Sequence, residues 1–391
     1  AYQYGWQLLN INQTSDGSYS FYPNEYIQNR SLTWETSKIA QVGLESTFLN
    51  NRLDFNLDYY VKNTINLYFD ESLPGSSGFQ NIQYNDGELR NSGIEFDINA
   101  KLIEAKSAGN LKLSVGVNGE MFKNEITRMP NGFFTGEERV LINGQYSLGH
   151  SLYDWYMREW AGVDPANGAG LWNLYYNDLN GNNIFDSGDE GITSMTLYLH
   201  DNPDANVQKT TTTNYAQATQ KYVGKSAIPK VRGSFRLNAE YKNFDLTAQF
   251  SYSVGGYVYD SGYAQLMDNS DLIGANNWHK DILKAWKEPG DVTNVPRLTS
   301  GYNTDVNYNS FSTRFLTKAD FLSLNNVKIG YTIPKQFTDK LKISNLNLYF
   351  SGDNLMMLSA RNGLNPTTLV GTSNSGIYMP MTTFSFGTKI E

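Results

Sequence analysis

The feature that most constrains the fold of this chain is an alternation of apolar and polar residues that recurs along its length. Between positions 54 and 61, Phe55, Leu57, Tyr59 and Val61 alternate with polar residues such as Asp58. Successive side chains of a β-strand point to opposite faces, so this period of two predicts strands with one apolar and one polar face. The pattern returns at 94–102, 111–117, 234–241, 245–252, 346–350 and 382–390.

The connections between these strands favour a transmembrane barrel over a soluble β-sandwich, which would show the same alternation. Tight turns are expected at Asn50-Asn51 and Lys242-Asn243. Long polar connections are expected at 70–86, 130–153, 164–226, 259–310 and 357–380. Loops beyond ~15 residues are uncommon in compact soluble domains, whereas short turns at one rim and long loops at the other are typical of outer-membrane barrels. The sequence therefore predicts an all-β antiparallel transmembrane barrel.

The composition agrees with such a barrel. Aromatic residues make up 14% of the chain and charged residues only 18%. No run approaches the ~20 apolar residues of a membrane-spanning helix. Barrel strands need no such run, because lipid-facing apolar residues alternate with lumen-facing polar ones. Aromatic pairs near predicted strand ends, such as Tyr59-Tyr60 and Tyr68-Phe69, suit the two interfacial girdles of a barrel.

Several functional classes are disfavoured by the same counts. The chain has no cysteine, which removes disulfides and thiolate metal sites. Its net charge of -8 argues against a nucleic-acid binder. Three histidines, with no nucleophile elbow, HExxH motif or phosphate-cradling glycine loop, predict that the chain is not an enzyme.

One segment departs from the strand pattern. In 277–288, Trp278, Ile282, Leu283 and Trp286 recur at near-helical spacing before Pro289. This spacing predicts a short helix within a long loop.

A second segment, Asp178 to Asp189, has the spacing of an EF-hand-like calcium loop. Asn183 stands where that loop demands glycine, and asparagine tolerates the left-handed conformation better than most residues. A solvated Asn/Asp turn is the alternative interpretation, and flanking helices are not evident. The predicted ligands of a structural calcium ion are Asp178, Asn180, Asn182, Asp186 and Asp189.

Aromatic residues of the predicted loops are the candidates for substrate contact, because flat rings stack on sugar faces or peptide side chains. Packing within the loops is an equally weighted alternative. The candidates are Trp155, Trp160, Trp172, Tyr175, Tyr176, Trp278 and Trp286.

Several short phrases occur in a set order from position 32 to the C-terminus. They are LTWE at 32–35, GLE at 43–45, FLNNRL at 48–53, NSGIE at 91–95, WAGVDP at 160–165, PKV at 229–231, YKNFDL at 241–246, FLSLNNVKIGYTIP at 321–334 and SGDNL at 351–355. In this order they resemble the C-terminal half of SusC/RagA-like TonB-dependent transporters. The family usually ends on an aromatic residue one position beyond Glu391.

The resemblance implies that residues 1–391 are the C-terminal part of a Gram-negative outer-membrane barrel, with long extracellular loops. About ten strands are expected here, against about 22 in a plugged transporter. We expect the chain to begin inside a longer polypeptide, because Ala1 to Asn10 carry no signal peptide and the N-terminal plug and TonB box are missing.

The implied activity is import of oligosaccharides or peptides, driven by the TonB complex through the absent N-terminal region. A SusD/RagB-like surface lipoprotein is the implied partner. The alternatives are a passive barrel, a siderophore-type transporter, a structural or assembly subunit of a larger outer-membrane complex, and a soluble carbohydrate-binding protein.

Overall fold

The computed structural model describes residues 9–23, 25–105, 110–268, 277–298, 307–367 and 379–390. The chain forms two compact units. Unit 1 comprises Ala1–Gln41, Tyr60–Ser92 and Lys123–Leu152, and unit 2 comprises Val42–Tyr59, Gly93–Phe122 and Tyr153–Glu391. Glu391, the predicted end of the last strand, lies outside the described residues.

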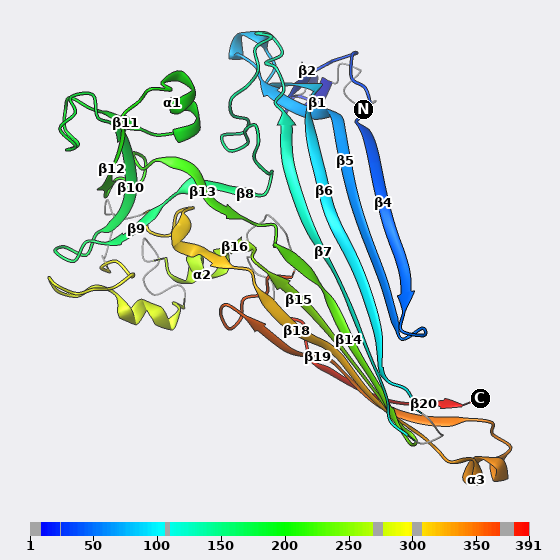
Figure 1. Cartoon of the computed structure of the whole chain (residues 1–391). Helices are drawn as coiled ribbons and strands as arrows, with labels where there is room; N and C mark the ends of the chain where they lie inside the picture. Colours follow the sequence, from blue (N-terminus) through cyan, green and yellow to red (C-terminus); the bar gives the residue numbers. More distant parts are fainter. Residues whose placement is uncertain are drawn as a thin grey trace. The chain divides into compact units, whose positions relative to one another are not determined.

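A ten-stranded sheet is the main element of the described chain (Figure 1). Along the sheet, each strand lies beside its predecessor in sequence, and shorter elements are inserted between some of them. In order, the strands are β4 (Thr36–Phe48), β5 (Leu53–Ser72), β6 (Asn81–Ile103), β7 (Lys112–Arg128), β14 (Val231–Tyr241), β15 (Phe244–Val254), β18 (Phe321–Thr332), β19 (Leu346–Ser359) and β20 (Thr383–Ile390), and β3 (Tyr26–Ile27) pairs in parallel with β6.

The alternating segments predicted as strands all fall on strands of this sheet, except for the first residue of 111–117 and of 382–390. The predicted tight turns are also confirmed. Between β4 and β5, Asn50 and Asn51 have φ of 55° and 64°, and between β14 and β15, Lys242 has φ of 53°. Asparagine reaches this left-handed region more readily than most residues, so it suits such turns.

Cross-strand register gives the sheet one continuous apolar face within unit 2. From β7 to β20, antiparallel pairing places six apolar residues opposite one another in one row: Leu113, Ala239, Leu246, Ile329, Phe350 and Phe386. Directly opposed residues of an antiparallel pair share a face. Ile329, Phe350 and Phe386 are 48%, 49% and 73% exposed, so nothing in the described chain covers this end of the row.

One of the predicted long connections is wrong. Residues 70–86 belong mostly to β5 and β6, which continue past their alternating stretches and are joined by a connection that contains the 3₁₀ turn η2 (Gly75–Ser77). The polar residues there keep their strand hydrogen bonds, since a sheet needs backbone pairing and not alternation.

The predicted connection 164–226 does lie between β7 and β14, but it folds into its own sheet and helix. Its backbone groups are buried with Trp172 and Leu174 and therefore need partners, which strand pairing supplies. The four-stranded sheet contains β9 (Trp160–Val163), β10 (Gly170–Asn177), β11 (Glu190–Ile192) and β12 (Val207–Thr212), followed by β13 (Gln220–Ser226), which pairs with β8 (Asp154–Arg158), while α1 (Met195–Asp201) follows β11.

The predicted helix at 277–288 is a shorter 3₁₀ helix, η3 (Lys280–Lys284), which ends well before Pro289. The remaining elements are short. They are β1 (Leu9–Gln13), β2 (Tyr19–Pro23), β16 (Tyr257–Tyr259), α2 (Ser261–Leu266), η4 (Thr313–Phe315), β17 (Leu316–Lys318), α3 (Lys335–Thr338) and η5 (Asp339–Leu341). Among the described helices, none has the length and apolar character needed to cross a membrane.

The buried clusters contain none of the residues of the apolar row. In unit 1, Ile126, Met129 and Ile142 pack together. In unit 2, one cluster includes Trp155 and Phe315 and another is centred on Trp172. The packing that orders unit 2 is therefore concentrated in the segments inserted between the long strands.

Candidate functional site

The face of the sheet opposite the apolar row is polar. One row of opposed residues consists of Gly116, Arg236, Gln249, Asn326, Asp353 and Thr383, and the next consists of Ser114, Asn238, Thr247, Lys328, Ser351 and Ser385. Side chains along these rows bond to one another. Asn326 donates to Asp353 at 2.6 Å, and Thr247 donates to Asn238 at 3.2 Å. This face therefore offers both hydrogen-bond donors and acceptors along neighbouring rows.

A hollow of about 650 Å³ lies on the sheet in unit 2. Asn56, Asp58, Glu95, Asp97, Glu120 and Arg232 contribute polar groups to its lining. Arg232 pairs with the opposed Glu120, so the carboxylates outnumber the cation. At the rim, a side chain on Gly233 would meet the carbonyl oxygen of Asn118 at 2.0 Å, so this close strand approach requires glycine.

Trp172, the most buried of the predicted substrate residues, lies at the centre of an aromatic cluster. Its ring is 1% exposed and lies 5.4 Å from Trp160, 5.5 Å from Tyr215 and 6.0 Å from Tyr308. Within the described part of the chain its indole nitrogen has no hydrogen-bond partner. Trp172 therefore packs the small sheet and does not present its ring to a ligand.

Trp155 and Tyr176 are buried in the same way. The Trp155 indole donates to the carbonyl of Tyr257 at 3.2 Å, and the Tyr176 ring lies 5.1 Å from Phe185. For these two residues, as for Trp172, the structure favours packing over substrate contact. Sequence reasoning did not separate the two roles, because burial depends on partners distant in the chain.

The other predicted aromatic residues are half-buried and stay candidates for substrate contact. Trp278 packs at the edge of the cluster around Trp155. Trp286 donates to the carbonyl of Pro165 at 3.1 Å, and its ring fills the space in which a Cβ on Gly168 would lie.

Tyr175 is the half-buried aromatic with the most charged surroundings. Its hydroxyl donates to Glu159 at 3.0 Å and accepts from Lys221 at 3.3 Å, and the Lys221 ammonium lies 4.7 Å from the ring centre. Burial raises the pKa of Tyr175. The hydroxyl therefore stays protonated at neutral pH and can donate.

The predicted calcium loop closes as its spacing suggests. Asn183 has φ of 59°, the left-handed conformation expected at the glycine position. The buried Asp178 carboxylate accepts from the backbone nitrogens of Gly181 at 2.8 Å and Asn183 at 2.9 Å. Such turns bring the predicted ligands to one end of β10.

The loop is also held by its own side chains. Asn182 donates its amide to Asp186 at 2.8 Å, and Asp189 accepts from the backbone nitrogen of Asp186 at 3.1 Å. Hydrogen bonds from Gly188 and Asn182 lower the pKa of Asp186.

In the described ranges, no group of three or more His, Cys, Asp or Glu residues is arranged to hold a metal ion. Calcium binding at this loop stays a prediction.

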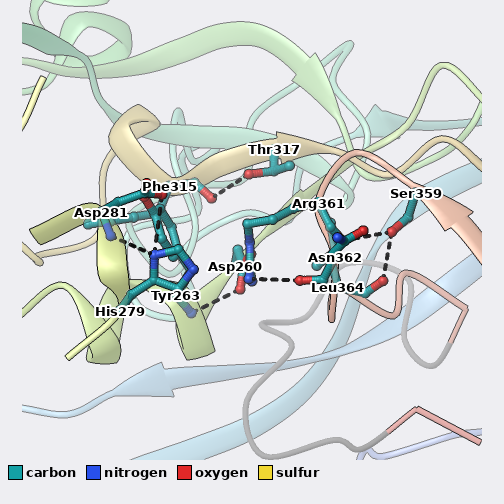
Figure 2. A network of polar contacts seen from close by, with 10 residues as sticks. All are labelled: Asp260, Tyr263, His279, Asp281, Phe315, Thr317, Ser359, Arg361, Asn362 and Leu364. Atoms are coloured by element: carbon teal, nitrogen blue, oxygen red, sulfur yellow. Dashed lines mark hydrogen bonds and ion pairs between the residues drawn. The ribbon is translucent and has the colours of Figure 1, made fainter. Parts of the chain in front are cut away.

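A buried polar network that sequence reasoning missed joins α2 to the connection after β19 (Figure 2). Asp260 is 2% exposed, caps α2 by accepting from the Tyr263 nitrogen at 3.0 Å, and pairs with Arg361. The Tyr263 hydroxyl donates to Asp281 at 2.9 Å. Burial, together with this bond to Asp281, raises the pKa of Tyr263 to about 12.

Arg314, the cation beside this network, was also missed. Burial lowers the pKa of Arg314 to about 10, so the guanidinium stays charged at neutral pH. Its place in η4 carries no local motif, and only the fold reveals its burial.

No protein-family model matches the chain. A TonB-dependent receptor, P3, from Formosa agariphila is 28% identical over 380 residues, which cover 93% of this chain and 35% of the relative. Over most of its length the chain is similar in sequence to TonB-dependent receptors.

Two further comparisons extend the likeness to this family of receptors. The TonB-dependent receptor SusC of Bacteroides thetaiotaomicron is 24% identical over 375 residues, covering 93% of this chain and 32% of that protein. The RagAB peptide importer in its closed-closed state matches with a TM-score of 0.75 and 24% identity, over 98% of this chain and 38% of the solved chain. The predicted SusC/RagA-like barrel fold is confirmed, and the chain spans about a third of the length of the relatives it matches.

Proposed function

We propose that this chain forms part of the wall of an outer-membrane barrel that imports oligosaccharides or peptides. The observation that carries the proposal is the sheet with two unlike faces, in a fold similar to the RagAB peptide importer at a TM-score of 0.75. The apolar row ending at Phe386 faces lipid, and the polar row ending at Thr383 faces the barrel interior.

The exposure of the apolar row supports this orientation. Contiguous apolar patches beyond a few hundred Å² are rare on proteins that face water, and they mark membrane or protein contacts. Phe350 and Phe386 are opposed and are 49% and 73% exposed, and Phe350 also stacks on Phe384 at 5.7 Å. Lipid contact would remove this surface from water.

Energy and partners come from outside the chain. Import would be driven by the TonB complex, and a SusD/RagB-like lipoprotein would cap the barrel at the cell surface. The half-buried Trp160, Tyr175, Trp278 and Trp286 are the proposed substrate contacts. The names of the relatives, which are receptors and an importer, support the prediction that the chain is not an enzyme.

Uptake by cells tests the proposal. The gene would be deleted in its host, and growth compared on oligosaccharide mixtures as sole carbon source and on peptide mixtures as sole nitrogen source. We expect growth to fail on one class and to return with the intact gene. Normal growth and uptake on both classes, with the protein present in the outer membrane of the parent strain, would contradict import and favour a structural or assembly role.

The partner is tested separately by purification. A tagged protein extracted in mild detergent should retain a surface lipoprotein. Recovery without any lipoprotein, from cells that import normally, would contradict the proposed partnership and leave import itself standing.

A further inference from the structure

A small cavity in unit 2 lies among the segments inserted between the long strands. Its volume is about 160 Å³, enough for a group of a few heavy atoms. The polar and aromatic part of its lining consists of Tyr263, Asp281, Lys284, Thr293, Asn294, Arg314 and Phe315. These residues come from α2, η3, η4 and the connection that precedes Val295.

Arg314 is the group in this wall whose charge is least compensated. Its guanidinium lies 4.8 Å from the ring centres of both Trp160 and Phe315, and one of its nitrogens donates to the carbonyl of Tyr308 at 2.6 Å. Among the described residues, no carboxylate forms an ion pair with it. Aromatic faces offset part of a buried positive charge, but a guanidinium has five N–H donors to satisfy.

The carboxylate in the cavity wall is already matched by other partners. Asp281 forms an ion pair with Lys284 at 2.7 Å, accepts from the Tyr263 hydroxyl at 2.9 Å, and lies 3.2 Å from the His279 imidazole. The Asp281 and Lys284 charges cancel, which leaves the Arg314 charge unmatched within the wall. The cavity therefore has the electrostatic character of an anion site.

Asn294 adds a neutral donor to the same wall. Its side-chain oxygen accepts from the Trp160 indole at 2.6 Å, so its amide nitrogen is the group directed to other partners. Trp160 is thus held at its indole nitrogen by Asn294, and the Arg314 guanidinium lies over its ring. A planar anion lying beside the Arg314 guanidinium would therefore contact side chains whose positions are already fixed.

We propose that this cavity binds a carboxylate group, with Arg314 as its counter-ion. One carboxylate carries the single negative charge that neutralises the wall, whereas a phosphate dianion would leave an excess. The planar guanidinium matches the two oxygens of a carboxylate in a bidentate pair. The carboxylate belongs either to a free small acid or to a larger ligand such as an acidic sugar or a peptide terminus. Binding here does not depend on the import proposal.

Saturation-transfer NMR on the detergent-purified full-length protein tests the site. The probes are acetate, glucuronate and N-acetylglycine, with acetamide as the neutral isostere of acetate. We expect saturation of at least one carboxylate probe and none of acetamide. Acetate alone would indicate a free small acid, and glucuronate or N-acetylglycine would indicate a sugar acid or a peptide terminus.

Two variants test whether carboxylate binding depends on Arg314 itself or on any positive charge of the protein. Arg314→Met keeps an unbranched stem between the two rings, and we expect it to weaken binding about tenfold or more, because hydrogen bonds to charged groups are the stronger class. Arg158→Met is the matched control. Arg158 also lies over an aromatic ring, that of Tyr215 at 4.4 Å, but it does not line the cavity.

The proposal is overturned by either of two results. One is saturation of acetamide as strong as that of the carboxylate probes, or no saturation of any carboxylate probe, in the wild-type protein. The other is unchanged carboxylate binding in folded Arg314→Met. Should Arg314→Met fail to fold, the wild-type comparison of the three carboxylate probes with acetamide still decides, and Arg314→Lys, which keeps the charge but loses the planar fork, should show reduced binding.

Discussion

Arg361 donates to the buried carboxylate of Asp260 at 2.9 Å, across 101 residues of sequence. Figure 2 shows the pair between α2 and the connection that follows β19. The Arg361 guanidinium also lies 4.8 Å from the centre of the Tyr263 ring. The contact therefore fastens a connection near the C-terminus to a helix cap inserted between β15 and β18.

Removing one partner of this pair should loosen the connection. Arg361→Met leaves the Asp260 carboxylate buried without its cation, a change that typically costs ~3–5 kcal/mol. We expect a lower thermal midpoint and faster proteolysis near residues 360–367. Mass spectrometry of the proteolytic fragments identifies the site of cutting.

A double variant provides the control for that prediction. Asp260→Asn keeps a capping oxygen for α2 but removes the charge, so the combination with Arg361→Met should be less destabilised than the sum of the two single changes. Strict additivity would show that the ion pair contributes nothing by itself.

The raised pKa of Tyr263 predicts a loss of stability at alkaline pH. The folded-state pKa is about 12 and the ordinary value is 10.0, so both states are protonated below pH 10. Between pH 10 and 12 the unfolded state releases the proton first, and the free energy of unfolding falls as pH rises. Denaturant unfolding at a series of pH values measures this slope.

Comparison with Tyr263→Phe isolates the contribution of this residue. The lowered pKa of Arg314 acts in the opposite direction in the same pH range, and Tyr263→Phe removes the tyrosinate charge that partly raises it, so this opposing effect is retained in the variant. We expect a shallower fall in the variant, and identical slopes would exclude Tyr263 as a source of the pH dependence.

The loop from Asp178 to Asp189 should be stabilised by calcium if its predicted ligands bind the ion. A ligand that binds only the folded state at about 100 times its dissociation constant adds ~2.7 kcal/mol. We expect calcium to raise the thermal midpoint and protect the loop from protease, and a chelator to reverse both. Magnesium, which prefers stricter octahedral geometry, should have less effect.

Two substitutions define the specificity of that response. Asp178→Asn should abolish it, whereas Asp204→Asn, at an exposed position outside the loop, should leave it intact. An equal calcium response in all three proteins would assign the effect to another site.

Substitutions at two adjacent residues of β20 test which face of the sheet contacts lipid. Phe386 belongs to the apolar row and Ser385 to a polar row. A lysine on the lipid face near the middle of the bilayer costs ~2–4 kcal/mol, whereas a lumen-facing lysine is tolerated. We therefore expect Phe386→Lys to lower the amount of folded protein in the outer membrane, and Ser385→Lys to have little effect.

Gel mobility with and without heating measures the folded fraction for both variants. A loss of folded protein in Ser385→Lys that equals or exceeds the loss in Phe386→Lys would contradict lipid contact at the apolar row.

The strands and turns of the main sheet were predictable because their signals are local. The alternation in 245–252 sets the direction of successive side chains, and Asn50-Asn51 set the backbone conformation of a turn. Both effects depend only on residues within a few positions. The closure of the calcium loop around Asn183 was predictable for the same reason. The small sheet in 164–226 was not, because its strands are short and each pairs with a segment whose position the fold decides.

Two-faced strands follow from the residue pattern alone, since a period of two assigns each side chain to a face wherever the strand lies. Which polar groups are buried together depends on how distant segments fold against one another. Arg361 meets Asp260, and Arg314 lies 4.8 Å from the ring centres of Trp160 and Phe315, because such segments converge there. The free energy of a charge depends on what surrounds it, and those surroundings come from parts of the chain that no local pattern connects.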